Sequence, residues 1–129
     1  MRDLRDLTKQ ELEDLNGEVI SHIDVDKTSD EILITTESGR QILIYHAQEC
    51  CEVVGIRSVS PDYTNAVKEI ILSLNTTEMQ FDSAESDSQT ITVVELKTTG
   101  CTVVSVWFGE SNGYYSESVD IAEIIKTNE

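Results

Sequence analysis

The stretch EILITTESGRQILIYH, residues 31–46, decides the fold class. Two runs of β-branched and apolar residues, 31–36 and 40–46, are separated by Glu37-Ser38-Gly39, a short loop of hairpin length. Residues 19–25, just before them, alternate with the period of two that is typical of a sheet strand. We therefore expect a three-stranded antiparallel meander over about residues 18–46.

Two helices are predicted outside this meander. Thr8 and Glu11 form a capping-box pattern, and Gly17 offers a stop, so a short helix should lie near the N-terminus. Ser60-Pro61-Asp62 has the residues of a helix start, and a stripe of apolar residues at helical spacing follows it, Val67, Ile70, Ile71 and Leu74. The pattern predicts one longer helix near residues 61–74.

The rest of the chain indicates further strands. Residues 53–59, 78–81, 90–96, 101–108 and 114–120 are predicted strands, and Asn112-Gly113 favours a tight turn that joins the last two into a C-terminal hairpin. That hairpin would place Phe108 on the core face and Trp107 on the opposite face. We expect an α+β fold in a single domain, 1–129, with a mobile loop at 82–89 and flexible ends at 1–7 and 126–129.

Charge is the strongest compositional signal. The 129 residues include nine Lys plus Arg and 25 Asp plus Glu, a formal net charge of -16. Such a chain repels phosphate, which argues against direct binding of nucleic acid or anionic membranes, and it would attract a partner with a basic surface. The acidic residues are spread along the chain, which favours solubility over a dedicated acidic binding face as their role. Three cysteines, two of them adjacent, do not form a disulfide framework, so we expect reduced thiols in a reducing, cytoplasmic setting.

Two segments concentrate polar and reactive side chains at predicted strand ends, YHAQECCE at 45–52 and GESNGYYSES at 109–118. A strand end holds polar groups on a rigid scaffold without burying them, so these segments are the candidate binding surface. We expect the two segments to lie side by side at one end of the same sheet. The candidate binding residues are His46, Cys50, Cys51, Glu52, Glu110, Asn112, Tyr114, Tyr115 and Glu117.

The first segment leaves several chemistries open. His46, Cys50 and Glu52 carry zinc-ligand groups, but four ligands cannot be assembled with suitable spacing, so no metal and no cofactor are predicted. The alternative is a thiol nucleophile at Cys50. His46 would activate this thiol and Glu117 would orient the imidazole ring, although nearby negative charge disfavours the thiolate. His46 could equally cap a strand, and Glu52, Glu110 and Glu117 could supply a pair of acids.

The second segment suits recognition. Tyr114 and Tyr115 combine a large apolar ring with a polar tip, which fits a flat ligand or a partner's side chains. The other interpretation is that Asn112-Gly113 is only a turn and that the tyrosines cover a sheet edge.

Both segments, together with the acidic stretch near residues 62–72, resemble a family of short bacteriophage and prophage proteins of unknown function. The similarity runs from about Gly17 to Asp120, and its most specific part is the segment at 107–119. The resemblance implies a phage origin and one shared surface for both segments. It implies no activity.

The sequence therefore favours a non-enzymatic phage or prophage accessory protein that binds and modulates a bacterial host or defence component in the host cytoplasm. Two versions are mimicry of nucleic-acid charge against a basic host enzyme, and capture of a small nucleotide-like ligand between Tyr114 and Tyr115. The alternative is a metal- or thiol-dependent enzyme that uses His46, Cys50 and Glu117. The oligomeric state cannot be predicted from these patterns.

Overall fold

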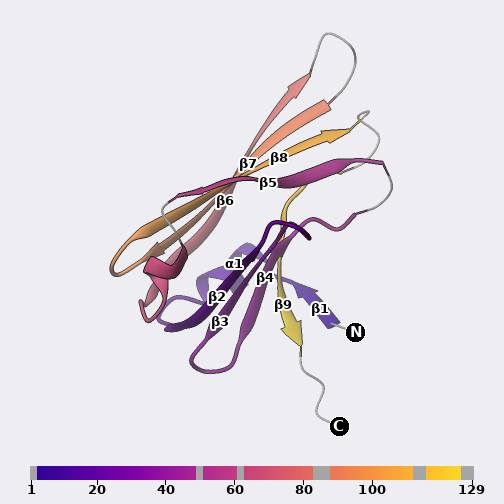
Figure 1. The fold of residues 1–129 in the computed structure, drawn as a ribbon. Helices are drawn as coiled ribbons and strands as arrows, with labels where there is room; N and C mark the ends of the chain where they lie inside the picture. Colours follow the sequence, from indigo (N-terminus) through magenta and orange to yellow (C-terminus); the bar gives the residue numbers. More distant parts are fainter. Residues whose placement is uncertain (1–2, 49–50, 61–62, 83–87, 112–115, 126–129) are drawn as a thin grey trace.

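The computed structural model describes residues 3–48, 51–60, 63–82, 88–111 and 116–125, and among these residues two antiparallel sheets dominate (Figure 1). The first sheet has the strand order β1-β9-β4-β3-β2, and the second has the order β5-β8-β7-β6. The strands are β1 (Asp3–Asp6), β2 (Ile20–Asp26), β3 (Glu31–Thr36), β4 (Gln41–Tyr45), β5 (Val53–Ser60), β6 (Ile71–Asp82), β7 (Ser88–Thr98), β8 (Thr102–Ser111) and β9 (Asp120–Ile125). The helical elements are α1 (Lys9–Glu13) and η1 (Tyr63–Ala66).

The predicted meander is confirmed in the first sheet. Strands β2, β3 and β4 pair antiparallel in chain order, and their isoleucines form an apolar inner face. Ile32 lies opposite Ile44, Ile34 lies opposite Ile42, and all four are fully buried. Strand β9 extends the sheet beside β4, and β1, in the segment expected to be flexible, forms its outer edge.

The short N-terminal helix is also confirmed. The Thr8 hydroxyl accepts the Glu11 N–H at 3.2 Å, and the Glu11 carboxylate accepts the Thr8 N–H at 3.1 Å, which completes the capping box. Leu15, just after α1, is fully buried in the core between the sheets. Gly17 follows with a φ of +95°, a conformation that suits the glycine predicted to end this helix.

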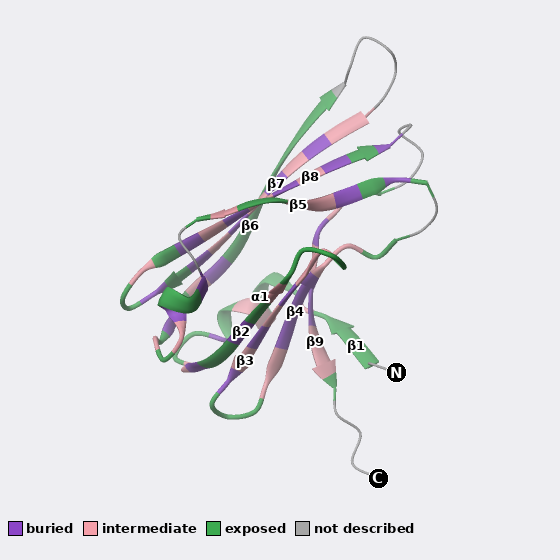
Figure 2. Cartoon of the chain, viewed as in Figure 1, coloured by how far each residue is buried: buried purple, intermediate pink, exposed green. Residues whose placement is uncertain are grey.

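The two sheets are joined by backbone hydrogen bonds at one end. The Ile20 N–H donates to the Glu69 carbonyl at 3.0 Å, and the Ile71 N–H donates to the Glu18 carbonyl at 2.8 Å. Figure 1 shows the second sheet above the first, with α1 and η1 on the side that faces the first sheet. Buried residues of both sheets form one core cluster, and Figure 2 colours the buried positions along the strands of both sheets.

The predicted α+β class is wrong, because the protein is mostly β. The longer helix expected near 61–74 is replaced, in its described part, by η1 and the start of β6. The strand register shifts between Ile71 and Ser73, so Ile71 and Leu74 are both buried although they lie three residues apart. A bulge thus reproduces the spacing of a helical stripe within a strand.

The predicted C-terminal hairpin is also wrong. Strand β8 pairs with β5 and β7, whereas β9 lies in the other sheet beside β4 and β1. The expected faces are reversed as well, since Trp107 is fully buried and Phe108 lies on the outer face, partly exposed. The Trp107 indole N–H donates to the Ser105 hydroxyl at 3.1 Å, so the ring is buried with its polar group satisfied.

Candidate functional site

The segment Ser116–Val119 carries the chain from the second sheet to the first. It is not part of a strand, and it leads directly into β9. Its close approach to β8 requires a glycine, because a Cβ on Gly109 would lie 2.9 Å from the Cβ of Glu117. This crossing segment places Glu117 over the end of the inner face of the second sheet.

Glu117 is a buried carboxylate held by hydroxyl groups. Its residue is only 6% exposed, although it comes from a segment rich in polar residues. The Thr90 hydroxyl donates to Oε1 at 2.8 Å, and the Ser111 hydroxyl donates to Oε2. Both donors are neutral, and among the described residues no Lys or Arg forms an ion pair with this carboxylate.

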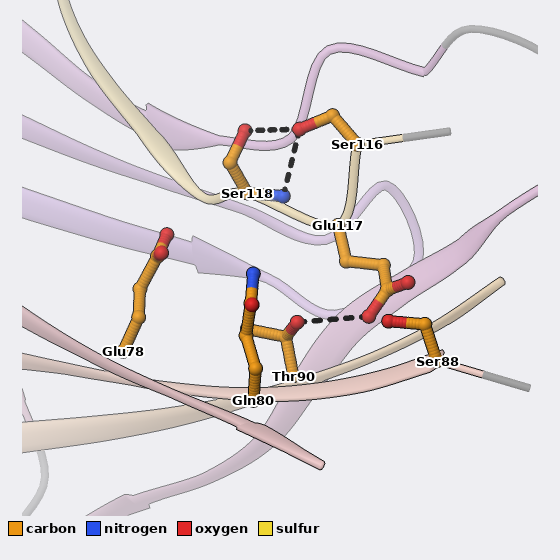
Figure 3. Close-up of a pocket in the computed structure, with 7 residues that line it drawn as sticks. All are labelled: Glu78, Gln80, Ser88, Thr90, Ser116, Glu117 and Ser118. Atoms are coloured by element: carbon orange, nitrogen blue, oxygen red, sulfur yellow. Dashed lines mark hydrogen bonds between the residues drawn. The ribbon is translucent and has the colours of Figure 1, made fainter. Parts of the chain in front are cut away.

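A polar cavity of about 310 Å³ opens beside Glu117. Figure 3 shows its lining, with Gln80 and Thr90 between the two carboxylates, Glu78 on one side and Glu117 on the other. The lining residues are Glu78, Gln80, Ser88, Thr90, Ser116, Glu117 and Ser118. The described lining thus contains oxygen acceptors and two acidic groups, and none of these seven residues is basic.

His46 ties the first sheet to the crossing segment. Its Nδ1 lies 2.6 Å from the carbonyl oxygen of Ser118, and its Nε2 lies 2.8 Å from Oε2 of Glu52. A carbonyl oxygen can only accept, so Nδ1 carries a proton, and the contact between Nε2 and Oε2 needs one further proton on either atom. The pair is therefore electrically neutral as a unit in either arrangement.

The His46–Glu52 pair is almost fully enclosed. The exposed fractions of the two side chains are 4% and 0%. Gln48 closes the pair from another side, because its Nε2 donates to the Glu52 carbonyl oxygen at 2.6 Å and lies 3.3 Å from Oε1 of Glu52. These contacts make His46 and Glu52 a rigid link between β4, β5 and the crossing segment.

Further acidic groups lie on the β9 side of this link. Burial raises the pKa of Asp120, and the neighbouring charges of Asp6 and Glu78 raise it further, while His46 lowers it. Burial also raises the pKa of Tyr45 to about 12, together with Asp6, to whose carboxylate the Tyr45 hydroxyl donates at 3.1 Å. Negative charge is therefore concentrated where the two sheets meet.

The structure brings together three of the predicted site residues, His46, Glu52 and Glu117, at this junction. The prediction that the two segments meet is confirmed by the contact between His46 and Ser118. The prediction that they lie on one sheet is correct only in part, because the first segment begins at the end of β4 in the first sheet and leads into β5, which pairs with β8 in the second. Glu110 is exposed near the end of β8. Four predicted residues lie outside the described part of the chain, namely Cys50, Asn112, Tyr114 and Tyr115.

The cysteines differ from the prediction. Cys51 is disulfide-bonded and exposed, whereas Cys101 is a free thiol. The expectation that every thiol is reduced is therefore wrong for Cys51, and the cysteines no longer argue for a reducing compartment.

Sequence reasoning missed much of the cavity lining. Glu78, Gln80, Ser88 and Thr90 lie on β6 and β7, far in sequence from the two polar segments. One signal was available, because the inward positions of β7 change from Leu96 and Val94 to Thr92 and Thr90 along the strand. A strand whose inward residues turn polar at one end points to a polar site between the sheets.

The arrangement can hold a positively charged group. The described residues contain no cluster of three or more His, Cys, Asp or Glu side chains suited to a metal ion. Two carboxylates among hydroxyl and amide oxygens instead match the several N–H donors of an ammonium or guanidinium group. Among the described residues, no helix is both long and apolar enough to cross a bilayer.

Comparison with known proteins places the chain in a family without assigning a function. No curated protein and no solved structure gives a significant match. A family model matches residues 13–121, a range that contains both polar segments and every residue that lines the cavity. The chain belongs to the family described as Domain of unknown function (DUF7448).

Proposed function

We propose that this protein is a non-enzymatic phage or prophage accessory protein that binds and modulates or inhibits a bacterial host or defence component in the host cytoplasm. The polar cavity holds a positively charged group of that partner. The phage origin and the host location rest on the resemblance of the two polar segments, and the binding role rests on the cavity.

One observation carries the proposal, the buried Glu117 carboxylate, to which the described part of the chain donates from two hydroxyl groups. A buried carboxylate is best stabilised by an opposite charge, and Thr90 and Ser111 supply none. An ammonium or guanidinium group that enters the cavity supplies that charge and bonds to Glu78 on the other side. The net charge of -16 steers such a basic partner toward the protein.

The same geometry disfavours the two other interpretations, a nucleotide-like ligand and a metal- or thiol-dependent enzyme. A phosphate group in the cavity would face Glu78 and Glu117 with no basic side chain in the lining, which disfavours a nucleotide-like ligand. The thiol-dependent enzyme would need His46 as an available base, and both ring nitrogens of His46 are engaged by Ser118 and Glu52. The metal- or thiol-dependent enzyme stays a prediction whose Cys50 lies outside the described residues.

Titration with a short peptide of Arg and Lys tests the proposal, with spermidine as a free cation for comparison. Glu117→Gln should weaken binding of the peptide about tenfold, because it removes the buried charge that the cation would neutralise. Glu37→Gln is the matched control, since it removes the same charge from an exposed position in the turn between β3 and β4, away from the cavity, and should change the affinity less than about twofold.

The outcomes separate the two interpretations of Glu117. Equal weakening by both variants would show only long-range attraction to an acidic protein, and the cavity would be rejected as the site. Binding of spermidine with the same dependence on Glu117 would identify a free organic cation, rather than a partner's side chain, as the occupant.

A further inference from the structure

The second sheet has two faces of opposite character. Along β8 the inward residues are buried, while Val104, Val106 and Phe108, which alternate with them, are partly exposed. The register places Phe108 beside Ile91 on β7, and Ile91 beside Met79 on β6. The outward residues therefore align in rows across the sheet.

These rows form an apolar patch, which we call the outer patch. Its members are Met79, Phe81, Ile91, Val93, Val106 and Phe108. Met79 is 50% exposed and Phe81 is 46% exposed, and the other four are partly exposed. Figure 1 shows the first sheet, α1 and η1 on the other side of the second sheet, and Figure 2 shows β6 exposed along most of its length.

This distribution reverses the usual pattern of a two-layer β protein. An antiparallel sheet normally places polar residues on its solvent face and apolar residues on its core face. Here the inward positions at the same end of the sheet include Thr90, Thr92 and Ser111, while the outward positions include an apolar row, Met79, Ile91 and Phe108, followed by the polar Gln89 and Glu110 at the strand ends. Contiguous exposed apolar surface of this kind marks an interaction site.

We infer that the outer patch docks a protein partner that has a basic surface and presents apolar side chains. This inference rests on the proposed function, and it adds a second contact surface for the same partner. Net charge selects the occupant, because a second copy of this chain and an anionic membrane would both be repelled by a protein of charge -16. A basic protein is attracted, and the patch then supplies the apolar burial.

Strand β6 connects the outer patch with the cavity. Glu78 and Gln80 line the cavity, and Met79 and Phe81, the residues that alternate with them, belong to the patch. Arg57 is already engaged, because its guanidinium lies 4.7 Å from the centre of the Phe108 ring. One partner at this end of the sheet can thus contact carboxylates on one side of β6 and apolar side chains on the other.

Binding of designed peptides tests the inference on the full chain. The probes are a short amphipathic peptide of Leu and Lys, and one of Ser and Lys with the same charge. The double variant Met79→Thr/Phe81→Thr should bind the Leu-Lys peptide about tenfold more weakly and the Ser-Lys peptide unchanged. Leu72→Thr is the matched control, since Leu72 is 50% exposed on the same strand outside the patch, and should bind both peptides normally.

Ile91→Thr, which keeps a β-branched side chain, is the second variant if the double variant does not fold, as judged by circular dichroism. Equal binding of the Leu-Lys peptide by patch and control variants would overturn the inference. A dimer that is detected by sedimentation and dissociated by a patch variant would also overturn the inference. Binding to uncharged vesicles that depends on the patch would overturn it as well. Failure of Glu117→Gln alone to change Ser-Lys binding would overturn the cavity proposal and leave the patch intact.

Discussion

Two carboxylates at different places in the fold, the partly buried Glu123 and the buried Glu117, have opposite surroundings. Glu123, on β9 in the first sheet, is bonded by arginines, with Arg40 Nε at 2.9 Å and Arg5 Nη2 at 3.2 Å. Glu117, at the end of the second sheet, is bonded among the described residues by the hydroxyls of Thr90 and Ser111. The protein therefore neutralises one carboxylate internally and leaves the other to neutral donors beside a cavity.

The difference separates a structural group from a candidate binding group. The arginines lower the pKa of Glu123, with the hydrogen bond from Arg40 as the largest cause. Nothing comparable surrounds Glu117 among the described residues, and its cavity adds a second carboxylate, Glu78. A buried acid beside a second acid destabilises the fold, so a role in binding a ligand explains this arrangement better than a structural role does.

A third carboxylate, Glu52, is paired with His46, and breaking this pair should give the largest effect on the free energy of unfolding. His46→Leu should lower the free energy of unfolding by about 3–5 kcal/mol, because it removes the imidazole that lies 2.8 Å from the buried Glu52 carboxylate. Urea denaturation measures the change. His22→Leu is the control, since the His22–Asp24 pair has side chains 62% and 63% exposed and should be dispensable.

A double variant sharpens this test. His46→Leu/Glu52→Leu removes both partners, so it should be more stable than His46→Leu alone. If His46→Leu unfolds at the same urea concentration as the unaltered protein, the His46–Glu52 pair does not hold the two sheets together.

Part of the fold could be predicted from the sequence, and part could not. The meander was predictable because β3 alternates regularly and pairs its isoleucines with those of β4, while β4 is an unbroken apolar run between turn residues. β6 was mistaken for part of a helix because its register shift places Ile71 and Leu74, three residues apart, on the buried side. A pattern read along one strand cannot show a bulge, which exists only relative to the neighbouring strand.

The site was predictable only in part, for a similar reason. His46, Glu52 and Glu117 were identified because reactive groups are crowded in two short segments. Thr90 and Glu78 were missed, because their roles depend on the register between β6 and β7 and on the crossing segment above them. The reversed faces of β8 had the same origin, since Asn112-Gly113 favoured a partner strand that belongs to the other sheet.

Loss of the ion pair between Arg40 and Glu123 should lower the stability of the fold moderately, by an amount that depends on pH. Arg40→Met should lower the free energy of unfolding at neutral pH by about 1 kcal/mol, the size of a well-ordered ion pair near the surface. The folded-state pKa of Glu123 is lowered, so the pair stabilises the protein above the unfolded pKa and loses its effect as pH falls through the folded one. The two proteins should therefore converge in acid, as urea denaturation at several pH values would show.

Lys97→Met is the control for that series, because Lys97 and Glu95 form an exposed pair at 3.9 Å. It should leave the urea midpoint unchanged at every pH. A constant difference between Arg40→Met and the unaltered protein down to strong acid would assign the effect to lost packing of the Arg40 side chain instead of its charge.

The smallest expected effect is a gain of stability at Asp120, where the excess of negative charge is not neutralised. Burial and the charge of Asp6 raise its folded-state pKa, so the ionised group opposes folding at neutral pH and this opposition disappears as pH falls through that pKa. Asp120→Asn should therefore raise the melting temperature slightly at neutral pH and have no effect in acid, and its amide oxygen can still accept the hydrogen bond from the Ala47 N–H. A lower melting temperature at neutral pH would mean that attraction between His46 and Asp120 outweighs the repulsion, and the charge at the junction would then be as well neutralised as that of Glu123.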